Sequence, residues 1–398
     1  MIINSVRNLK NLKNKTVFLR VDFNVPISQG KIKEDYKIKV GLETIKYLVA
    51  RGARLIIATH LGEPTKKFEA AYSVRPVAAR LRTLLKKPVK FLGAALGPKI
   101  AETIKKMPSG SIVCLENLRF NPGEYDNDDS FAKTLASLAD IYVNDAFAVC
   151  HRQQASVVAI KKYLPSYAGC LLEKEVEALY KIIKPKKPLV IILGGTKINT
   201  KAPLISKLYP VASQILLGGA LANSFFKFQG LEVGKSLIDS DLLIYGDGAK
   251  ELKKFFQGKK VNSKFILPQD VVIKTKKGEV RVVSPTEVKA TDCILDIGPA
   301  TISTYASYIR QAQTLIWNGP LGKFEEPSFK NGTLIIASLI AARSSGHAYG
   351  VVGGGETIAA LKLTKMAEYV DWISTAGGAM LTYLGGGKMP GLSKIIKK

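Results

Sequence analysis

The chain has 398 residues, 46% of them hydrophobic, and carries 59 Lys and Arg against 32 Asp and Glu, a formal net charge of +27. This length predicts two domains, each able to bury its own core, and excludes a disulfide-stapled miniprotein. No apolar run is long enough to span a membrane and the first residues lack the apolar core of a signal peptide, so we expect a soluble, cytoplasmic protein. The four cysteines and three histidines are scattered without a CxxC pair, which favours neither a zinc site nor a disulfide framework.

The positive charge is spread along the chain. Residues 1–170 hold 28 Lys and Arg against 14 Asp and Glu, and the remaining residues carry nearly as large an excess. A nucleic-acid-binding surface would concentrate its basic residues, so this distribution argues against nucleic-acid binding, which stays the weakest alternative. A general surface bias that steers small polyanionic substrates fits the distribution better.

In the first half of the chain, short runs rich in Val, Ile and Leu end in turn or polar residues and alternate with segments of helical period. Apolar runs of this length between helices indicate buried parallel strands. The predicted strands lie at residues 16–25, 54–59, 89–92, 112–115 and 141–144.

The second half repeats this pattern after a segment of helical period at 170–183, which ends before Pro185 and Pro188. The segment 271–283 differs, because VVIKT and VRVVS flank KKGE and predict a β-hairpin. The parallel strands are expected at residues 189–193, 215–217, 293–297, 315–317, 348–352 and 372–374.

We therefore predict an α/β fold of two doubly wound parallel-sheet, Rossmann-like domains joined by a connecting helix and a hinge. The expected division is an N-terminal domain at 1–169, a connecting helix at 170–187, a C-terminal domain at 188–375, and a hinge and tail at 376–398.

Polar side chains follow the strands of the first half. Ligands bind at the carboxyl ends of strands in open parallel sheets, so these residues should meet at one edge. Any one of them alone is more simply a surface or capping residue, but four strand ends agree. Arg, His, Asn and Asp together suit a small anion with carboxylate, hydroxyl and phosphate groups. The residues are Arg20, Asp22, Asn24, His60, Glu116, Arg119, Asn144 and Arg152.

The strands of the second half end instead in glycine. Glycines at strand-to-helix turns let backbone amides approach a phosphate at a helix N-terminus, where the helix dipole favours negative charge. Six such strand ends in one half predict a nucleotide-binding module. They lie at residues 194–197, 218–220, 298–301, 318–322, 353–357 and 374–378.

Motifs along essentially the whole chain resemble those of the phosphoglycerate kinase family. They are Arg20–Pro26, Glu116–Phe120, Asn144–Phe147, Leu267–Val272, Trp317–Pro320, Gly353–Gly355 and Lys388–Gly391. The resemblance implies an N-terminal domain for 3-phosphoglycerate or 1,3-bisphosphoglycerate, a C-terminal domain for Mg²⁺ with ADP or ATP, and a tail that returns to the first domain. It also implies reversible phosphoryl transfer by domain closure and electrostatic stabilisation in a monomeric protein that binds neither nucleic acid nor membrane.

The resemblance assigns roles by position. Substrate binding falls on Asp22, Asn24, Lys37, His60, Gly62, Glu63, Arg119 and Arg152. Nucleotide binding falls on Lys197, Lys201, Asn318, Glu325, Gly354, Gly355, Glu356 and Thr357, with Glu325 placed for the ribose and Glu356 linked indirectly to the metal. Catalysis falls on Lys37, Lys197, Gly377 and Gly378.

The chain departs from the family pattern at several of these places. Lys37 stands where the family has its catalytic arginine, and Glu63 replaces an arginine near the expected substrate phosphate. These two changes motivate the alternative of a catalytically impaired member that acts as a nucleotide-binding protein. The other departures are Gln154 for His, Thr200 for Asp, Glu356 for Asp and Ala376 for Gly.

Overall fold

The computed structural model describes residues 2–239, 250, 256–257, 260–261 and 263–397. The chain divides into two compact units: unit 1 is Met1–Val176 with Lys388–Lys398, and unit 2 is Glu177–Gly387. The division of the chain into four segments stays a prediction. Among the described helices, none has the length and apolar character needed to cross a membrane.

Unit 1 is built on a six-stranded parallel sheet of order β6-β7-β5-β2-β8-β9. The central strand β2 is buried along its whole length, as a continuous apolar run in a parallel sheet requires. The five predicted strands are confirmed, although the first ends at Val21 rather than Val25 and a sixth strand, β9, was not predicted. The strands are β2 Thr16–Val21, β5 Arg54–Ala58, β6 Val89–Phe91, β7 Ile112–Cys114, β8 Ile141–Asp145 and β9 Ser166–Ala168.

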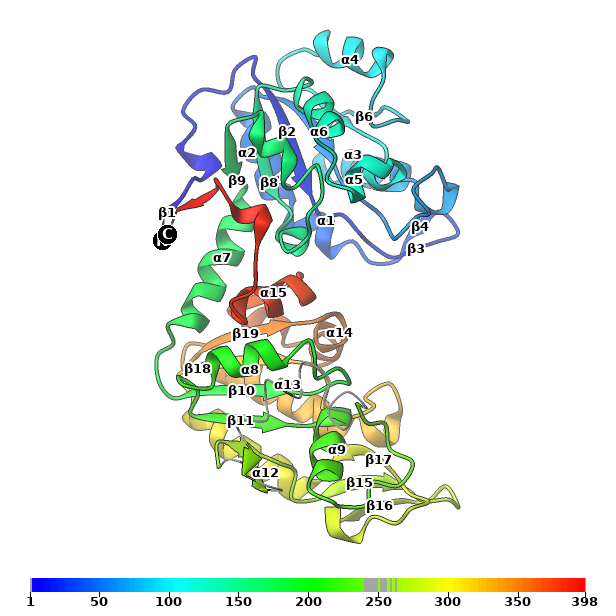
Figure 1. Cartoon of the computed structure of the whole chain (residues 1–398), viewed down its shortest axis with the longest axis vertical. Helices are drawn as coiled ribbons and strands as arrows, with labels where there is room; N and C mark the ends of the chain where they lie inside the picture. The colour runs from blue at the N-terminus through cyan, green and yellow to red at the C-terminus, as the bar shows by residue number, and fades with distance from the viewer. Residues whose placement is uncertain (1, 240–249, 251–255, 258–259, 262, 398) are drawn as a thin grey trace. The chain divides into compact units, whose positions relative to one another are not determined.

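Helices connect these strands, as Figure 1 shows. Their starts follow ordinary capping chemistry: the Asp128 side chain accepts the Phe131 N–H at 2.7 Å where α6 begins, and proline stands in the first turn of α3, α4 and α5. Apolar side chains of β2, β5, α2 and α3 form one core cluster. The helices are α1 Tyr36–Val40, α2 Leu42–Ala50, α3 Arg75–Leu85, α4 Pro98–Lys105, α5 Pro122–Tyr125 and α6 Asp129–Ala136.

The end of the chain belongs to unit 1. Strand β21 (Ile396–Lys397) pairs antiparallel with β1 (Ile2–Ile3), the red and blue ends of the ribbon in Figure 1. The buried ammonium of Lys161 donates to the Pro390 carbonyl at 2.6 Å, and to the Ser393 carbonyl and hydroxyl at 2.9 and 2.8 Å. A charged side chain therefore fixes the tail to the body of unit 1.

Unit 2 is also built on a six-stranded parallel sheet, of order β14-β11-β10-β18-β19-β20. The two sheets confirm the predicted α/β fold class. One short strand, β14, was not predicted. The strands are β10 Leu189–Leu193, β11 Gln214–Leu217, β14 Phe265–Ile266, β18 Thr314–Asn318, β19 Tyr349–Gly353 and β20 Trp372–Ser374.

The prediction that residues 293–297 form a further parallel strand is wrong. Strand β17 (Cys293–Ile297) lies in a separate antiparallel sheet of order β16-β15-β17, with Val271 opposite Ile297. Its first four residues alternate between half-buried and buried, which is typical of a sheet with one covered face. The predicted hairpin is confirmed as β15 (Val271–Lys274) and β16 (Val280–Val283).

Three helices of unit 2 begin with glycine at the carboxyl edge of its parallel sheet: α9 follows β11, α14 follows β19 and α15 follows β20. The helix α7 (Cys170–Ile183) carries the chain from unit 1 into unit 2. The other helices are α8 Ala202–Leu208, α9 Gly219–Phe228, α12 Pro299–Gln311, α13 Asn331–Ser344, α14 Gly355–Leu363 and α15 Gly377–Leu384.

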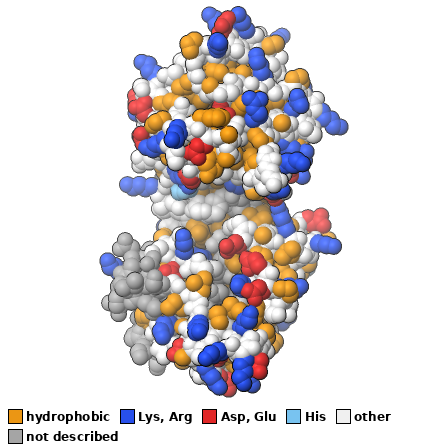
Figure 2. Space-filling view, turned by 90° about the vertical axis from the view of Figure 1, so that its right-hand side faces the viewer, with side chains coloured by type: hydrophobic (Ala, Val, Ile, Leu, Met, Phe, Trp, Pro, Cys, Tyr) orange, Lys and Arg blue, Asp and Glu red, His pale blue; other side chains and the backbone are white. Residues whose placement is uncertain are grey.

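Lys and Arg side chains are scattered over the face of each unit that Figure 2 shows, interspersed with acidic and apolar residues. They do not gather into one stripe on this face, in keeping with the even distribution of charge along the chain.

Candidate active site

His60 lies just after β5, buried beside the end of β2. Its Nδ1 is 3.3 Å from Nη2 of the fully buried Arg20. A guanidinium can only donate, so Nδ1 accepts and the ring proton sits on Nε2. Burial, followed by the charge of Arg20, holds the pKa of His60 well below its usual value. His60 is therefore a neutral ring with its N–H on Nε2, the nitrogen that lies 4.0 Å from Asp22 Oδ1.

Asp22, Asn24 and Lys37 lie around His60. Lys37, on the short helix α1, places its Nζ 2.7 Å from Asp22 Oδ2. Asn24 accepts the N–H of Gly62 at 3.0 Å. Gly62 has a φ of +59°, and a Cβ there would overlap the Tyr72 ring, so this close turn requires glycine.

Arg119 and Arg152 converge on one carboxylate. Glu63 Oε1 lies 2.8 Å from Arg119 Nη1 and 3.1 Å from Arg152 Nη1, and the Tyr125 hydroxyl donates to Oε2 at 3.1 Å. The Arg119 side chain is 1% exposed, whereas those of Glu63 and Arg152 are 58% and 41% exposed. Burial lowers the pKa of Arg119, and the Glu63 carboxylate opposes that shift.

The buried guanidinium of Arg119 has donors to spare. Its Nη1 also donates to the Gly62 carbonyl at 2.8 Å. Its Nε and Nη2, however, are buried without a hydrogen-bond partner among the described residues. Unpaired charged donors are costly in a folded protein and often mark a site that a ligand completes.

The structure thus brings together all eight residues predicted for substrate binding, at the carboxyl edge of the unit 1 sheet. Arg20, predicted among the anion-binding residues at the strand ends, lies beside this group and contacts His60. One neighbour, Tyr125, was not predicted from the sequence. Tyr125 follows a Pro-Gly-Glu sequence without a distinctive pattern, and only the fold shows that it reaches Glu63.

At the carboxyl edge of the unit 2 sheet, the backbones of neighbouring loops lie in close contact. A Cβ on Gly194 would overlap the Pro320 carbonyl, and one on Gly319 would overlap the Gly194 carbonyl, so the loops after β10 and β18 touch through glycine. Asn318 Nδ2 donates to the Gly353 carbonyl at 2.7 Å, and Thr357 Oγ1 accepts the Gly319 N–H at 2.8 Å. Asn318 and Thr357 therefore hold neighbouring loops together.

A cavity of about 620 Å³ opens beside these loops within unit 2. Its apolar walls include Phe226, Leu237 and Leu295. Its lining also includes the predicted residues Glu325 and Glu356, together with Gly195 and Lys323. Such a pocket suits a ligand with a flat apolar part and a charged end.

The two predicted lysines of unit 2 differ in environment. Lys197 is exposed in the loop between β10 and α8. Lys201 is buried just before α8, and its Nζ donates to the Lys197 carbonyl at 3.4 Å. Burial lowers the pKa of Lys201, with Asp239 and Glu356 opposing the shift.

The glycines at the starts of α14 and α15 face open space. Among the described residues, no atom beyond the chain neighbours and the same helix lies within 4 Å of a Cβ built on Gly355, Gly377 or Gly378. Gly354 has a φ of +104° and needs its glycine for the turn. The first N–H groups of a helix have no partner within that helix, so these two helix starts can offer amides to an anion. No packing of the described residues requires glycine at 355 or 378.

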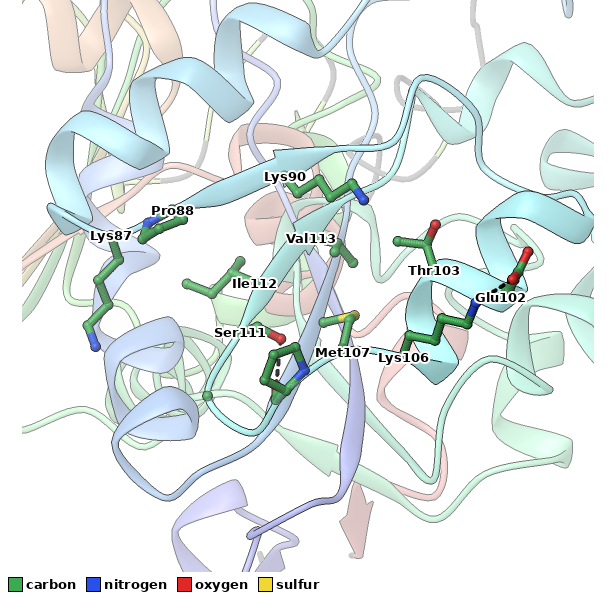
Figure 3. Close-up of a pocket in the computed structure, with 12 residues that line it drawn as sticks. Lys87, Pro88, Lys90, Glu102, Thr103, Lys106, Met107, Ser111, Ile112 and Val113 are labelled. Carbon is green, nitrogen blue, oxygen red and sulfur yellow. Dashed lines mark hydrogen bonds and ion pairs between the residues drawn. The ribbon is translucent and has the colours of Figure 1, made fainter.

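A second cavity, of about 580 Å³, lies at the opposite end of unit 1 and has no predicted site residue in its lining. Figure 3 shows Lys87, Lys90 and Lys106 around Ile112 and Met107, with Lys106 paired to Glu102 at 2.6 Å. Residues at the amino ends of β6 and β7 line this cavity. It is distinct from the edge at which the predicted residues meet.

Comparison with known proteins decides the family. The family model described as phosphoglycerate kinase matches residues 6–387. The chain belongs to the phosphoglycerate kinase family. The phosphoglycerate kinase of Thermomicrobium roseum is 40% identical over 99% of both chains, and that of Dictyoglomus turgidum is 41% identical over 98% of this chain and 97% of its own.

Solved structures agree. The phosphoglycerate kinase from Coxiella burnetii matches with a TM-score of 0.84 at 38% identity over 99% of both chains. That from Pyrococcus horikoshii matches with a TM-score of 0.83 at 31% identity over 98% of both chains. The chain thus has the activity of this family, reversible phosphoryl transfer to a carboxyl acceptor.

Phosphoglycerate kinases generally act on a magnesium nucleotide. Among the described residues, no group of three His, Cys, Asp or Glu side chains can hold a metal ion. Mg²⁺ is commonly held by substrate phosphates, water and one or two carboxylates. Glu356, predicted as an indirect metal contact, lies in the first turn of α14 and lines the cavity of unit 2.

Proposed function

We propose that unit 1 binds 3-phosphoglycerate or 1,3-bisphosphoglycerate at the edge formed by the ends of β2 and β5 and by the short 3-10 helix Leu118–Phe120, which carries Arg119. The observation that carries this proposal is the buried guanidinium of Arg119, with two unpartnered nitrogens, beside the guanidinium of Arg152. In this proposal the two arginines bind the phosphate group that stays on the substrate and is not transferred. Asp22, Asn24 and the Nε2–H of His60 bind the glycerate hydroxyl and carboxylate.

We propose that unit 2 binds ADP or ATP. The apolar walls of its cavity suit the base, and the exposed carboxylate of Glu325 suits the ribose hydroxyls. Lys201, Gly354, Gly355 and Thr357 surround the phosphates, as the glycine-bearing helix starts support. When bound, Mg²⁺ supplies charge neutralisation for the nucleotide phosphates, and Glu356 would hold it through water or directly.

The chemistry asks the protein mainly to align the reactants. An acyl phosphate has a carboxylate as its leaving group, so the remaining task is to neutralise charge on the transferring phosphoryl group. Lys37, Lys197 and the amides of Gly377 and Gly378 are proposed for this task. Because the two sets of binding residues belong to separate units, the proposal includes a closing motion that brings the bound substrates together and excludes water.

The proposal is tested by kinetics in both directions with a coupled assay, combined with binding of each substrate alone by calorimetry. We expect 3-phosphoglycerate and ATP each to bind the intact chain without the other, and turnover only with both. A chain that binds nucleotide but shows no turnover would instead support the alternative of an impaired member. A monomeric state and a cytoplasmic location stay predictions, the first of which light scattering tests.

A further inference from the structure

The carboxylate of Glu63 occupies the place between the two arginines to which an anionic group would bind. One oxygen accepts from both guanidiniums, at 2.8 Å from Arg119 and 3.1 Å from Arg152, and the other accepts from the Tyr125 hydroxyl. The chain therefore supplies its own anion to the arginine pair. Glu63 reaches this position because it follows Gly62, whose left-handed turn and carbonyl bond to Arg119 fix the start of the loop.

We propose that Glu63 is a tethered competitor of the substrate phosphate, which holds the Arg119–Arg152 pair in the free protein and leaves it when phosphoglycerate binds. The inference rests on the function proposed above, in which these arginines bind the substrate phosphate. Glu63 thereby becomes a residue that sets substrate affinity, although it makes no favourable contact with the bound substrate.

The exposure of the side chains permits such an exchange. Glu63 and Arg152 are 58% and 41% exposed, so the carboxylate can move into water at small cost. Arg119 is 1% exposed and loses much of its compensation if no anion replaces Glu63. An exchange of one anion for another avoids leaving this buried charge alone.

The substrate phosphate is the stronger partner. A phosphate monoester carries nearly two negative charges and three acceptor oxygens, and it pairs well with guanidinium groups. Glu63 carries one charge and spends one oxygen on Tyr125, while Nε and Nη2 of Arg119 stay unpartnered. The phosphate therefore displaces Glu63, but the net gain is smaller than it would be on a vacant arginine pair.

The competitor also serves the free protein. Arg20, Lys37, Arg119 and Arg152 all lie near enough to His60 to lower its pKa. Arg20 pairs with Glu124 and Lys37 with Asp22, whereas Arg119 and Arg152 share Glu63. Glu63 reduces the repulsion among these charges. The proposal thus predicts opposite effects of removing the carboxylate: lower stability without ligand, and tighter binding of the phosphate.

The test is calorimetric titration of 3-phosphoglycerate into the intact chain at fixed ionic strength, together with the melting temperature without ligand. For Glu63→Gln we expect the Kd to fall by about two- to fivefold, the range of a modest ion pair, and the melting temperature to fall. Tyr125→Phe frees one oxygen of Glu63 without removing it, so its Kd should change by less than about twofold. Asp126→Asn is the matched control: it removes an equally exposed carboxylate that pairs with Lys66, and its Kd should not change.

Two results would overturn the inference. An unchanged Kd in Glu63→Gln would show that the carboxylate does not compete, and a raised Kd would show that it positions the arginines for the substrate. Arg152→Gln separates these failures from a failure of the proposed function. If Arg152→Gln raises the Kd while Glu63→Gln leaves it unchanged, only the competitor is wrong; if neither changes it, the phosphate does not bind at these arginines.

Discussion

The two units present different chemistry at the same edge of similar sheets. At the carboxyl edge of unit 1, charged side chains converge, with Arg119, Arg152 and Glu63 in direct contact. At the carboxyl edge of unit 2, the loops after β10 and β18 touch through glycine, and helices begin in open space. Side-chain sites can be retuned by single substitutions, whereas backbone sites tolerate few. Glu63 and Lys37 are side-chain departures of this kind in unit 1, whereas the departures of unit 2, at Thr200, Glu356 and Ala376, leave glycine at 354, 355, 377 and 378.

The largest effect is expected at Lys197, the exposed charged side chain proposed for catalysis in the backbone-built unit. Lys197→Ala should lower kcat by about 10²- to 10³-fold, because its charge is needed as the phosphoryl group transfers. The KM for ADP should stay within a few-fold if backbone amides carry most of the nucleotide binding. Steady-state kinetics measure both constants, and Lys207→Ala on the exposed face of α8 is the control. A large rise in the ADP KM of Lys197→Ala would show that this side chain, and not the backbone, carries the nucleotide binding.

Arg152→Gln should act on unit 1 alone. We expect the KM for 3-phosphoglycerate to rise roughly tenfold to 100-fold, since a charge-assisted hydrogen bond contributes about 1.5–3 kcal/mol. The KM for ATP should not change. If the ATP constant rises and the phosphoglycerate constant does not, the two substrates have been assigned to the wrong units.

In unit 1 a side chain, Lys161, also holds the C-terminal tail in place. Lys161→Met removes the donor to Pro390 and Ser393, so the free energy of unfolding should fall by about 2 kcal/mol in denaturant titrations. Lys162→Met is the matched control, because the exposed pair of Lys162 with Asp129 should contribute less than about 1 kcal/mol. Equal losses in the two variants would contradict a specific anchor for the tail.

The loss of stability in Lys161→Met should also depend on pH. Burial lowers the pKa of Lys161 to about 8, from 10.5 for the free side chain. Between these values the unfolded chain binds more protons than the folded chain, so this group makes stability rise with pH. The loss caused by Lys161→Met should therefore be larger at pH 9 than at pH 7. A loss that shrinks over this range would show that the folded pKa is not lowered.

The smallest effect is expected at Gly378. A methyl group there would meet no atom of the described residues outside its own helix, and alanine is the better helix former, so Gly378→Ala should keep or raise the melting temperature. It should nevertheless lower kcat about tenfold if the amides at the start of α15 approach the phosphoryl group. Gly194→Ala provides the contrast: its Cβ would overlap the Pro320 carbonyl, so it should lower the melting temperature. An unchanged kcat in Gly378→Ala would remove the start of α15 from the site.

Much of the fold could be predicted from local patterns. Continuous apolar runs such as 189–193 indicated the buried strands, and their polar ends indicated the edge where Arg119 and His60 meet. The strand at 293–297 was assigned to the wrong sheet because its partner, β15, is set by tertiary packing and not by its own residues. Strand β14 has only two residues, and β9 reads Ser-Tyr-Ala, which is not an apolar run.

The details of the site were less accessible. The sequence placed Glu63 near the expected phosphate, and the structure adds that its carboxylate binds Arg152, which lies 89 residues away in the chain. The proton position on His60 depends on the buried Arg20, and the open space before Gly378 depends on its neighbours. Contacts between distant residues of this kind follow from the folded backbone.

The most direct test of the account is hydrogen exchange of the intact chain with each ligand alone. With ADP and Mg²⁺ we expect protection of the backbone amides at residues 194–197, 319–322, 354–357 and 376–378, and with 3-phosphoglycerate protection at 60–63 and around Arg119 and Arg152. If the backbone of unit 2 binds the nucleotide, ADP with Mg²⁺ must protect these glycine-bearing loops. If side chains of unit 1 bind 3-phosphoglycerate, its protection must stay within unit 1. Protection of the unit 2 glycine loops by 3-phosphoglycerate alone, or no protection there by the nucleotide, would contradict the account.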